Sequence, residues 1–148
     1  MPKGGYIMYQ YSLFLFRQSY AEYFYFKIDL LYRFLNSDSQ STVFQQQREL
    51  VLDQVKLIDV YRLLNAHFPE EMSVDIGKQV IIMNSVGQEV KIVMNDYSMD
   101  VYAPSILEAD EWFFKYIKSL HPHIFVVNFT SQDYGWMLPL SKNKLYQL

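Results

Sequence analysis

The chain has 148 residues, a formal net charge of −3 and no cysteine. Its length suits one globular domain, and a hydrophobic content of 51% predicts a folded core rather than a disordered chain. The lack of cysteine excludes disulfides and thiolate chemistry, and the scattered Lys and Arg residues argue against direct nucleic-acid binding. No stretch approaches 18 apolar residues and the first residues lack a secretion-signal pattern, so we expect a cytoplasmic protein without a membrane span.

A central strand and two helical regions are expected in the first half of the chain. Residues 9–17 place apolar side chains on both faces, which is typical of a strand inside a sheet. Ser19 and Glu22 have capping-box spacing, which predicts a helix from Tyr20 to about Leu35. A second helical region, interrupted at an undetermined position, is expected from Thr42 to about Ala66.

The second half of the chain favours strands with one further helix. A hairpin is expected from residues 79–84 and 89–94, followed by a short strand at residues 99–103. Ser105 and Glu108 cap a helix expected to run to Leu120, and a strand at 123–129 follows. We therefore predict an α/β fold: one domain over residues 1–148 with a mixed β-sheet of about five or six strands and packed helices.

The sequence offers no motif for catalysis, metal binding or a cofactor. The histidines lack a ligand pattern, and the five glycines are too scattered to form a phosphate-binding loop. Glu108, Asp110 and Glu111 cluster in the first turn of a predicted helix, where the helix dipole stabilises negative charge. We therefore expect a protein that is not an enzyme and binds neither metal nor cofactor.

One alternative stays open, in which the protein is an enzyme or binds a small molecule. It would use a pocket beside Tyr134, Trp136 and Tyr97, close to the corner formed by His121 and His123. The sequence supplies no activated nucleophile or base for such a pocket.

The predicted first helix carries more apolar surface than one sheet can cover. A continuous helix over residues 20–35 would present an apolar arc of roughly 260 degrees, far wider than the stripe that a surface helix usually buries. The second helical region can cover part of this arc. Tyr20 and Phe24 lie one turn apart, with Tyr23 and Lys27 beside them, which favours an aromatic surface that binds a protein partner and has a charged rim.

Three segments resemble one known family. Residues 128–139 resemble the ending of the sporulation inhibitor of replication protein SirA family, whose pattern is an acid or amide, Phe, x, Ser, x, x, Tyr-Gly-Trp, x, x, Pro. Residues 108–118 are similar to the last helix of that family. Near the start, Tyr20 and Ala21 followed by the pair Phe24 and Tyr25 are also similar.

This resemblance implies a function and a set of contact residues. Members bind the N-terminal domain of the replication initiator DnaA and block new rounds of chromosome replication during sporulation. The resemblance places the binding surface at Tyr20 and Phe24, at Arg48 and Val51 in the following helix, and at Pro139. From the residue pattern we add Tyr23 as an apolar anchor, and we expect Lys27 and Arg48 to be charges at the rim of the surface. We also expect the protein to be a monomer.

Overall fold

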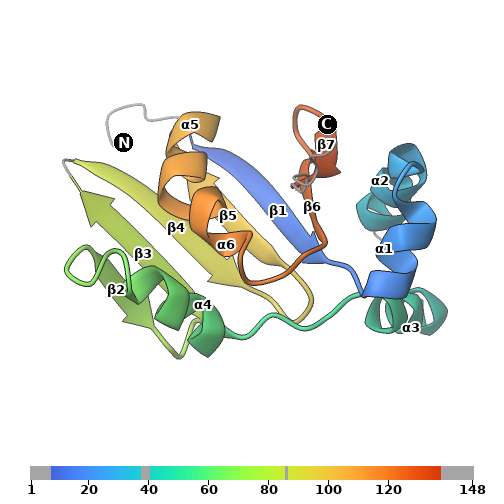
Figure 1. Cartoon of the computed structure of the whole chain (residues 1–148), viewed down its shortest axis with the longest axis horizontal. Coiled ribbons are helices and arrows are strands. Elements are labelled where there is room, and N and C mark those ends of the chain that lie inside the picture. The colour runs from blue at the N-terminus through green and yellow to red at the C-terminus, as the bar shows by residue number, and fades with distance from the viewer. Residues whose placement is uncertain (1–7, 38–40, 86, 138–148) are drawn as a thin grey trace.

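The structure is a computed structural model that describes residues 8–37, 41–85 and 87–137. Seven strands form one sheet: β1 (Tyr9–Leu15), β2 (Met72–Asp75), β3 (Val80–Ser85), β4 (Gln88–Met94), β5 (Met99–Ala103), β6 (Ile124–Asn128) and β7 (Asp133–Trp136). Their order across the sheet is β2-β3-β4-β5-β1-β6-β7, and every neighbouring pair is antiparallel (Figure 1).

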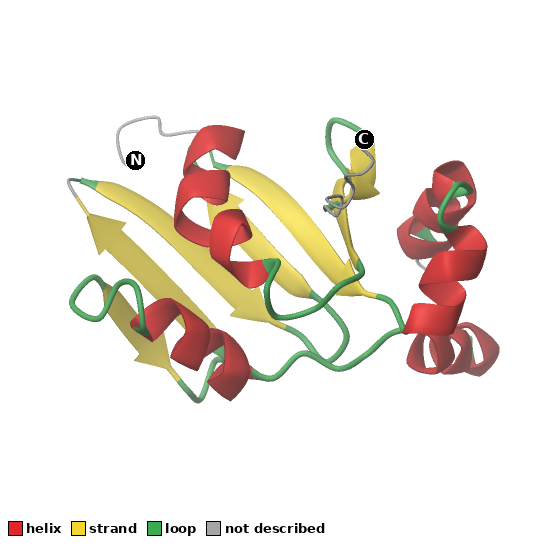
Figure 2. Ribbon diagram, viewed as in Figure 1, coloured by secondary structure: helices red, strands yellow, loops and turns green. Residues whose placement is uncertain are grey.

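The helices fall into two groups. The first comprises α1 (Gln18–Phe24), α2 (Ile28–Asn36) and α3 (Thr42–Val51), and we call these three helices the helical lobe. The second comprises α4 (Leu57–Asn65) and a continuous helix made of α5 (Ile106–Ala109), the π-helical segment η2 (Asp110–Phe114) and α6 (Lys115–Ile117). The helical lobe stands at the β7 end of the molecule, while the second group lies over the sheet (Figure 2).

Strand β1 belongs to two hydrophobic cores because its side chains alternate between the faces of the sheet. Leu13 and Leu15 pack in the core that includes α4 and the α5–α6 helix. Phe14 and Phe16 pack in a second core with the helical lobe and with strand β6. This arrangement confirms the prediction of a strand inside the sheet with two apolar faces.

The α/β prediction is confirmed, although the sheet differs from the expected one in two respects. It has seven strands rather than five or six, partly because β2 has only four residues and alternates between exposed and half-buried side chains, which gives a weak pattern. It is also antiparallel throughout rather than mixed. The chain crosses from β5 to β6 through the α5–α6 helix, so these two strands run in the same direction, but β1 lies between them and runs opposite to both.

The helix expected from Tyr20 to Leu35 is in fact two helices. The first starts earlier, at Gln18, and ends at Phe24, and the second begins at Ile28. Neither proline nor glycine occurs here, so local sequence does not explain the break. The Trp136 indole instead donates a hydrogen bond of 2.9 Å to the backbone carbonyl of Tyr25, which in a continuous helix would accept from the residue four positions later.

Other predicted elements agree more closely. The hairpin of β3 and β4 and the strands β5 and β6 lie where they were expected. The second helical region is interrupted at residues 52–56, where Leu52 forms an isolated bridge with Phe16. Ser105 caps α5 as expected, because its hydroxyl accepts a hydrogen bond from the Leu107 amide. That hydroxyl also donates to the Glu108 carboxylate, so the bonds differ from the reciprocal backbone bonds of a capping box.

Candidate functional site: an apolar groove in the helical lobe

The helical lobe contains an apolar groove of about 360 Å³ between its three helices. All three helices contribute side chains, including Tyr20, Phe24, Leu30, Phe34, Leu50 and Val51. The strand side of the groove is closed by Phe16, which is fully buried. Three of the predicted partner-binding residues, at positions 20, 24 and 51, therefore converge on one surface although they come from two different helices.

The aromatic residues of the groove are accessible from solvent. Tyr20 and Phe24 are both half-buried, so neither is wholly enclosed by neighbours within the chain. Leu30 and Leu50 are 43% and 55% exposed, and both line the groove. An apolar side chain from another protein could therefore be buried here against surfaces that are already ordered.

Tyr23 and Lys27 lie beside the groove rather than in its lining. The Tyr23 ring makes an edge contact with Phe24 at 4.7 Å between centroids, and the Lys27 ammonium lies 3.9 Å from the Tyr23 ring centre. Tyr23 is 65% exposed. A cation over an aromatic face is a favourable arrangement, and here it puts positive charge at the rim of the groove.

The predicted residues Arg48 and Pro139 stand apart from the others. Arg48 is half-buried, donates a hydrogen bond of 2.9 Å to the Leu35 carbonyl and lies 5.2 Å from the Phe44 ring centre. Burial lowers the pKa of Arg48. The hydrogen bond joins α3 to α2 and helps to shape the helical lobe. The predicted contact between Arg48 and a partner stays a prediction. Pro139 lies outside the described residues.

Sequence reasoning missed Phe26 as a candidate contact residue. It lies in the turn between α1 and α2 and is 91% exposed, the largest value among the exposed large apolar side chains of the described residues. A continuous helix gave no reason to single it out, because Phe26 lies in a turn that the sequence pattern did not predict.

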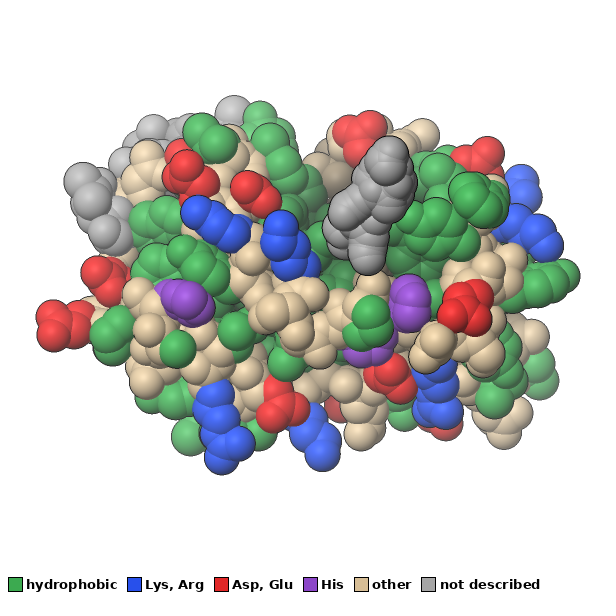
Figure 3. All heavy atoms as spheres, in the orientation of Figure 1, with side chains coloured by type: hydrophobic (Ala, Val, Ile, Leu, Met, Phe, Trp, Pro, Cys, Tyr) green, Lys and Arg blue, Asp and Glu red, His purple; other side chains and the backbone are tan. Residues whose placement is uncertain are grey.

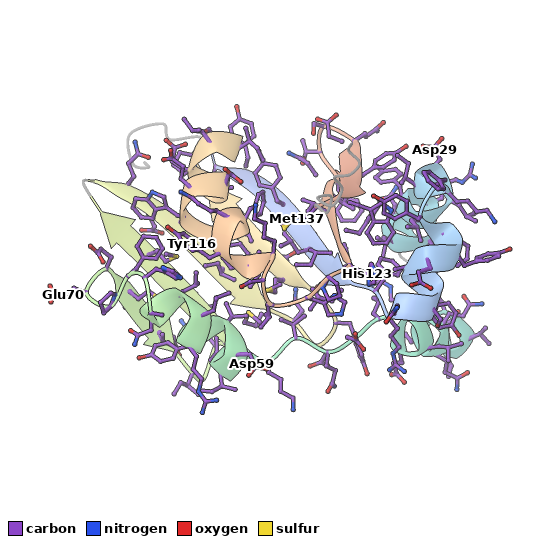
Figure 4. The ribbon with its side chains drawn as sticks, viewed as in Figure 1. Asp29, Asp59, Glu70, Tyr116, His123 and Met137 are labelled. Carbon is purple, nitrogen blue, oxygen red and sulfur yellow. The ribbon has the colours of Figure 1, made fainter. Side chains whose placement is uncertain are left out.

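The β6–β7 hairpin holds the helical lobe against the sheet. Tyr134 stacks on Tyr32 at 4.4 Å between ring centroids, and its hydroxyl donates a hydrogen bond of 2.5 Å to Asp29, which Figure 4 shows on the helical lobe. That hydrogen bond raises the pKa of Tyr134. Trp136 stacks on Tyr25 at 5.6 Å in addition to donating to its carbonyl.

The loop between β6 and β7 is set by its own side chains. The Asn128 side-chain oxygen accepts hydrogen bonds of 3.0 and 3.1 Å from the amides of Thr130 and Ser131. The Ser131 hydroxyl donates to Asp133 at 2.8 Å, and Gln132 adopts a positive φ of 63°. The segment that carries the family resemblance therefore builds the turn and supports the helical lobe.

The residues of the alternative pocket lie near one another but do not line one groove. The His123 ring lies 6.5 Å from the Trp136 ring and 6.3 Å from the His121 ring between centroids. His121 donates to or accepts from Asp53 at 2.8 Å, and Tyr97 packs in the core under the helical lobe. Tyr134 and Trp136 reach a second groove, described below, which neither histidine nor Tyr97 lines. Within residues 8–37, 41–85 and 87–137, no group of three His, Asp or Glu side chains could hold a metal ion.

The described helices are all too short or too polar to cross a membrane. By fold and site, this is an α/β protein with an apolar groove formed by three helices at one end of an antiparallel sheet. A family model described as sporulation inhibitor of replication protein SirA matches residues 9–141. The chain belongs to this SirA family, which confirms the resemblance seen in the sequence. No curated protein sequence matches the chain.

Proposed function

We propose that this protein inhibits the initiation of chromosome replication during sporulation by binding the N-terminal domain of DnaA in the groove of the helical lobe. Family membership supports a role in inhibiting replication. The observation that carries the binding proposal is the convergence of half-exposed Tyr20 and Phe24 with Val51 around one apolar groove. The inhibitor acts by occupying a surface and needs no chemistry of its own.

The energy for this interaction comes from apolar side chains that the fold leaves partly in water. Leu30, Leu50, Tyr20 and Phe24 all retain exposed surface in the free protein. Complete burial of one large apolar side chain contributes about 1.5–3 kcal/mol, so a partner that covers several of these residues gains enough to offset part of the cost of association. Aromatic side chains commonly dominate such interfaces.

The charge at the rim of the groove indicates which charge the surface of the partner should have. Lys27 stands beside Tyr23 and Phe24 at the edge of the groove, with its ammonium 3.9 and 5.9 Å from the two ring centres. We therefore expect the partner to present an apolar side chain to the groove and an acidic residue to Lys27. Charge pairs at a rim mainly affect the association rate, so the contribution of Lys27 should weaken as salt is raised.

Titration calorimetry with the purified DnaA N-terminal domain tests this proposal. We expect the parent protein to bind, and Phe24→Ala to bind at least about tenfold more weakly because the groove loses its central ring. Leu50→Asp should also weaken binding by putting a charge into the apolar lining, and its exposed position should leave the fold intact.

Ile76→Asp is the matched control, because Ile76 is 73% exposed and follows β2, the edge strand farthest from the helical lobe. This variant should bind DnaA like the parent. Circular dichroism checks that each variant is folded. Absence of binding by the parent would refute the proposal, as would folded Phe24→Ala and Leu50→Asp variants with unchanged affinity.

A further inference from the structure

A second groove, of about 480 Å³, lies on the other face of the β6–β7 hairpin. The helix α5–η2–α6 forms one wall, and strands β1, β6 and β7 form the floor. Figure 1 shows β1 passing between α5 and the β6–β7 hairpin, and Met137, which lines this groove, is labelled in Figure 4. The second groove is thus separate from the groove of the helical lobe.

The floor of the second groove is open at Gly135. This residue pairs with Val126 of β6, and both line the groove. Gly135 does not have a positive φ, and no described atom lies within 4 Å of the position that a Cβ would take. Neither backbone conformation nor crowding therefore requires glycine here. Because glycine has no side chain, position 135 leaves space on the floor for another molecule.

Polar groups without partners face the same space. Asn128 is only 8% exposed, and its side-chain oxygen is used within the hairpin loop, whereas its amide nitrogen donates to no described residue. The amide nitrogen is not itself enclosed, so it can donate to a molecule bound in the groove. Burial also raises the pKa of Tyr11, so the hydroxyl at the groove stays protonated and can donate a hydrogen bond.

The charges of the second groove indicate what kind of molecule it takes. Asp110 and Asp133 supply two carboxylates and Lys118 one ammonium, so the rim has an excess of negative charge. Phe114 and Val126 supply apolar surface below this rim. Asp110 and Phe114 are the first and last residues of η2, and π-helical segments occur often at functional sites.

We propose that the second groove binds an extended peptide segment of a partner protein in which an aliphatic side chain lies next to a basic residue. The aliphatic side chain occupies the space above Gly135, and the basic group meets the carboxylates of Asp110 and Asp133. The Asn128 amide and Tyr11 hydroxyl donate to the peptide carbonyls. The site is distinct from the groove of the helical lobe, with which it shares no lining residue.

NMR titration of the ¹⁵N-labelled full chain tests this proposal with two capped peptides, acetyl-Gly-Lys-Leu-Lys-Gly-amide and its counterpart with Glu in place of both Lys residues. We expect the lysine peptide to shift the amide signals of Val126, Asn128 and Gly135 in a saturable manner. The glutamate peptide should bind at least about tenfold more weakly, because it meets the carboxylates of the rim.

Gly135→Val fills the floor and should weaken binding of the lysine peptide at least about tenfold, while β-branched valine suits a strand. Ser73→Val, on the exposed face of the other edge strand β2, is the matched control and should bind like the parent. Asp110→Asn lies on an exposed helical position and gives a second variant that keeps the strand intact. It should also weaken binding of the lysine peptide.

The proposal is overturned if the lysine peptide causes no saturable shifts, if both peptides bind equally, or if folded Gly135→Val and Asp110→Asn bind like the parent. Shifts confined to the helical lobe would also overturn it. Gly135→Val should retain the parent affinity for the DnaA N-terminal domain, so failure of this proposal can be distinguished from failure of the proposed function.

Discussion

Trp136 and Tyr134 each join parts of the chain that are more than 100 residues apart. The Trp136 indole bonds to Tyr25 across a separation of 111 residues, and the Tyr134 hydroxyl bonds to Asp29 across 105. Each ring also stacks on an aromatic residue of the helical lobe. Two side chains of one short strand thus fix the position of α1 and α2 by both hydrogen bonding and ring contact.

Trp136→Phe tests the contribution of the indole hydrogen bond. The change keeps an aromatic ring but leaves the Tyr25 carbonyl without this donor, so we expect the free energy of unfolding to fall by about 1 kcal/mol or more. Urea unfolding followed by circular dichroism measures the loss. Trp112→Phe is the control, because Trp112 stacks on Phe68 and its indole donates to no described residue. Equal losses for the two variants would argue against the assigned role.

At the scale of elements, β1 supports both cores, and Phe16 is the residue that ties it to the helical lobe. Phe16 is buried, forms the bridge with Leu52, and contacts Trp136 and Phe125 at centroid distances of 5.6 and 6.2 Å. Its neighbour Leu15 points to the opposite core. A substitution that removes the Phe16 ring should therefore lower the stability of the helical lobe more than that of the sheet.

Phe16→Ala should lower the free energy of unfolding by about 3–5 kcal/mol, since it removes a buried ring and leaves a cavity. Urea denaturation measures the global loss, and hydrogen exchange should show the largest loss of protection in α1–α3. Tyr9→Ala, at the exposed start of the same strand, should change stability by less than about 1 kcal/mol. Similar losses at both positions would contradict the role given to Phe16.

Most elements could be predicted from local sequence because their signals are local. The alternation in β1, the hairpin of β3 and β4 and the Ser105 cap are all short-range patterns that the structure retains. The break after Phe24 could not be predicted, because the segment lacks proline and glycine and the hydrogen bond that the Tyr25 carbonyl accepts there comes from an indole 111 residues away. Strand β2 was missed because four residues with partly exposed side chains give too little pattern.

The groove of the helical lobe was predictable in part. The surplus of aromatic residues in the segment 20–35 indicated a surface around Tyr20 and Phe24, and both line the groove. The position of Arg48 was not predictable, since a sequence cannot show that its guanidinium reaches the Leu35 carbonyl. Leu50 was missed because its contribution depends on how α3 packs against α1 and α2.

At the scale of the whole molecule, the connection between α6 and β6 makes stability depend on pH. His123, labelled in Figure 4, lies there beside His121 and within range of the negative charge of Glu22, and histidine side chains are purple in Figure 3. Burial, and secondly the charge of His121, lower the pKa of His123 below 6.5, and Glu22 opposes this shift only in part. The unfolded chain therefore takes up this proton at a higher pH than the folded protein does.

This difference should make His123 destabilise the fold as the pH falls below about 6.5, with the loss complete once the pH is below the folded pKa. We expect His123→Phe to lose less stability than the parent between pH 7.5 and pH 5.5. Urea unfolding of both proteins at the two pH values measures this difference. An identical pH dependence in the two proteins would contradict the assignment.

The order of events during synthesis follows from the contact between Trp136 and Tyr25. Helices α1, α2 and α3 have seven, nine and ten residues, lengths at which an isolated helix in water is marginal. Strand β7, which contacts the helical lobe through Tyr134 and Trp136, is synthesised last among the described elements. A chain still being translated, or one cut short before Trp136, should therefore carry Tyr20 and Phe24 without the groove they line, so we expect the protein to become competent to hold another molecule there only after β7 has left the ribosome.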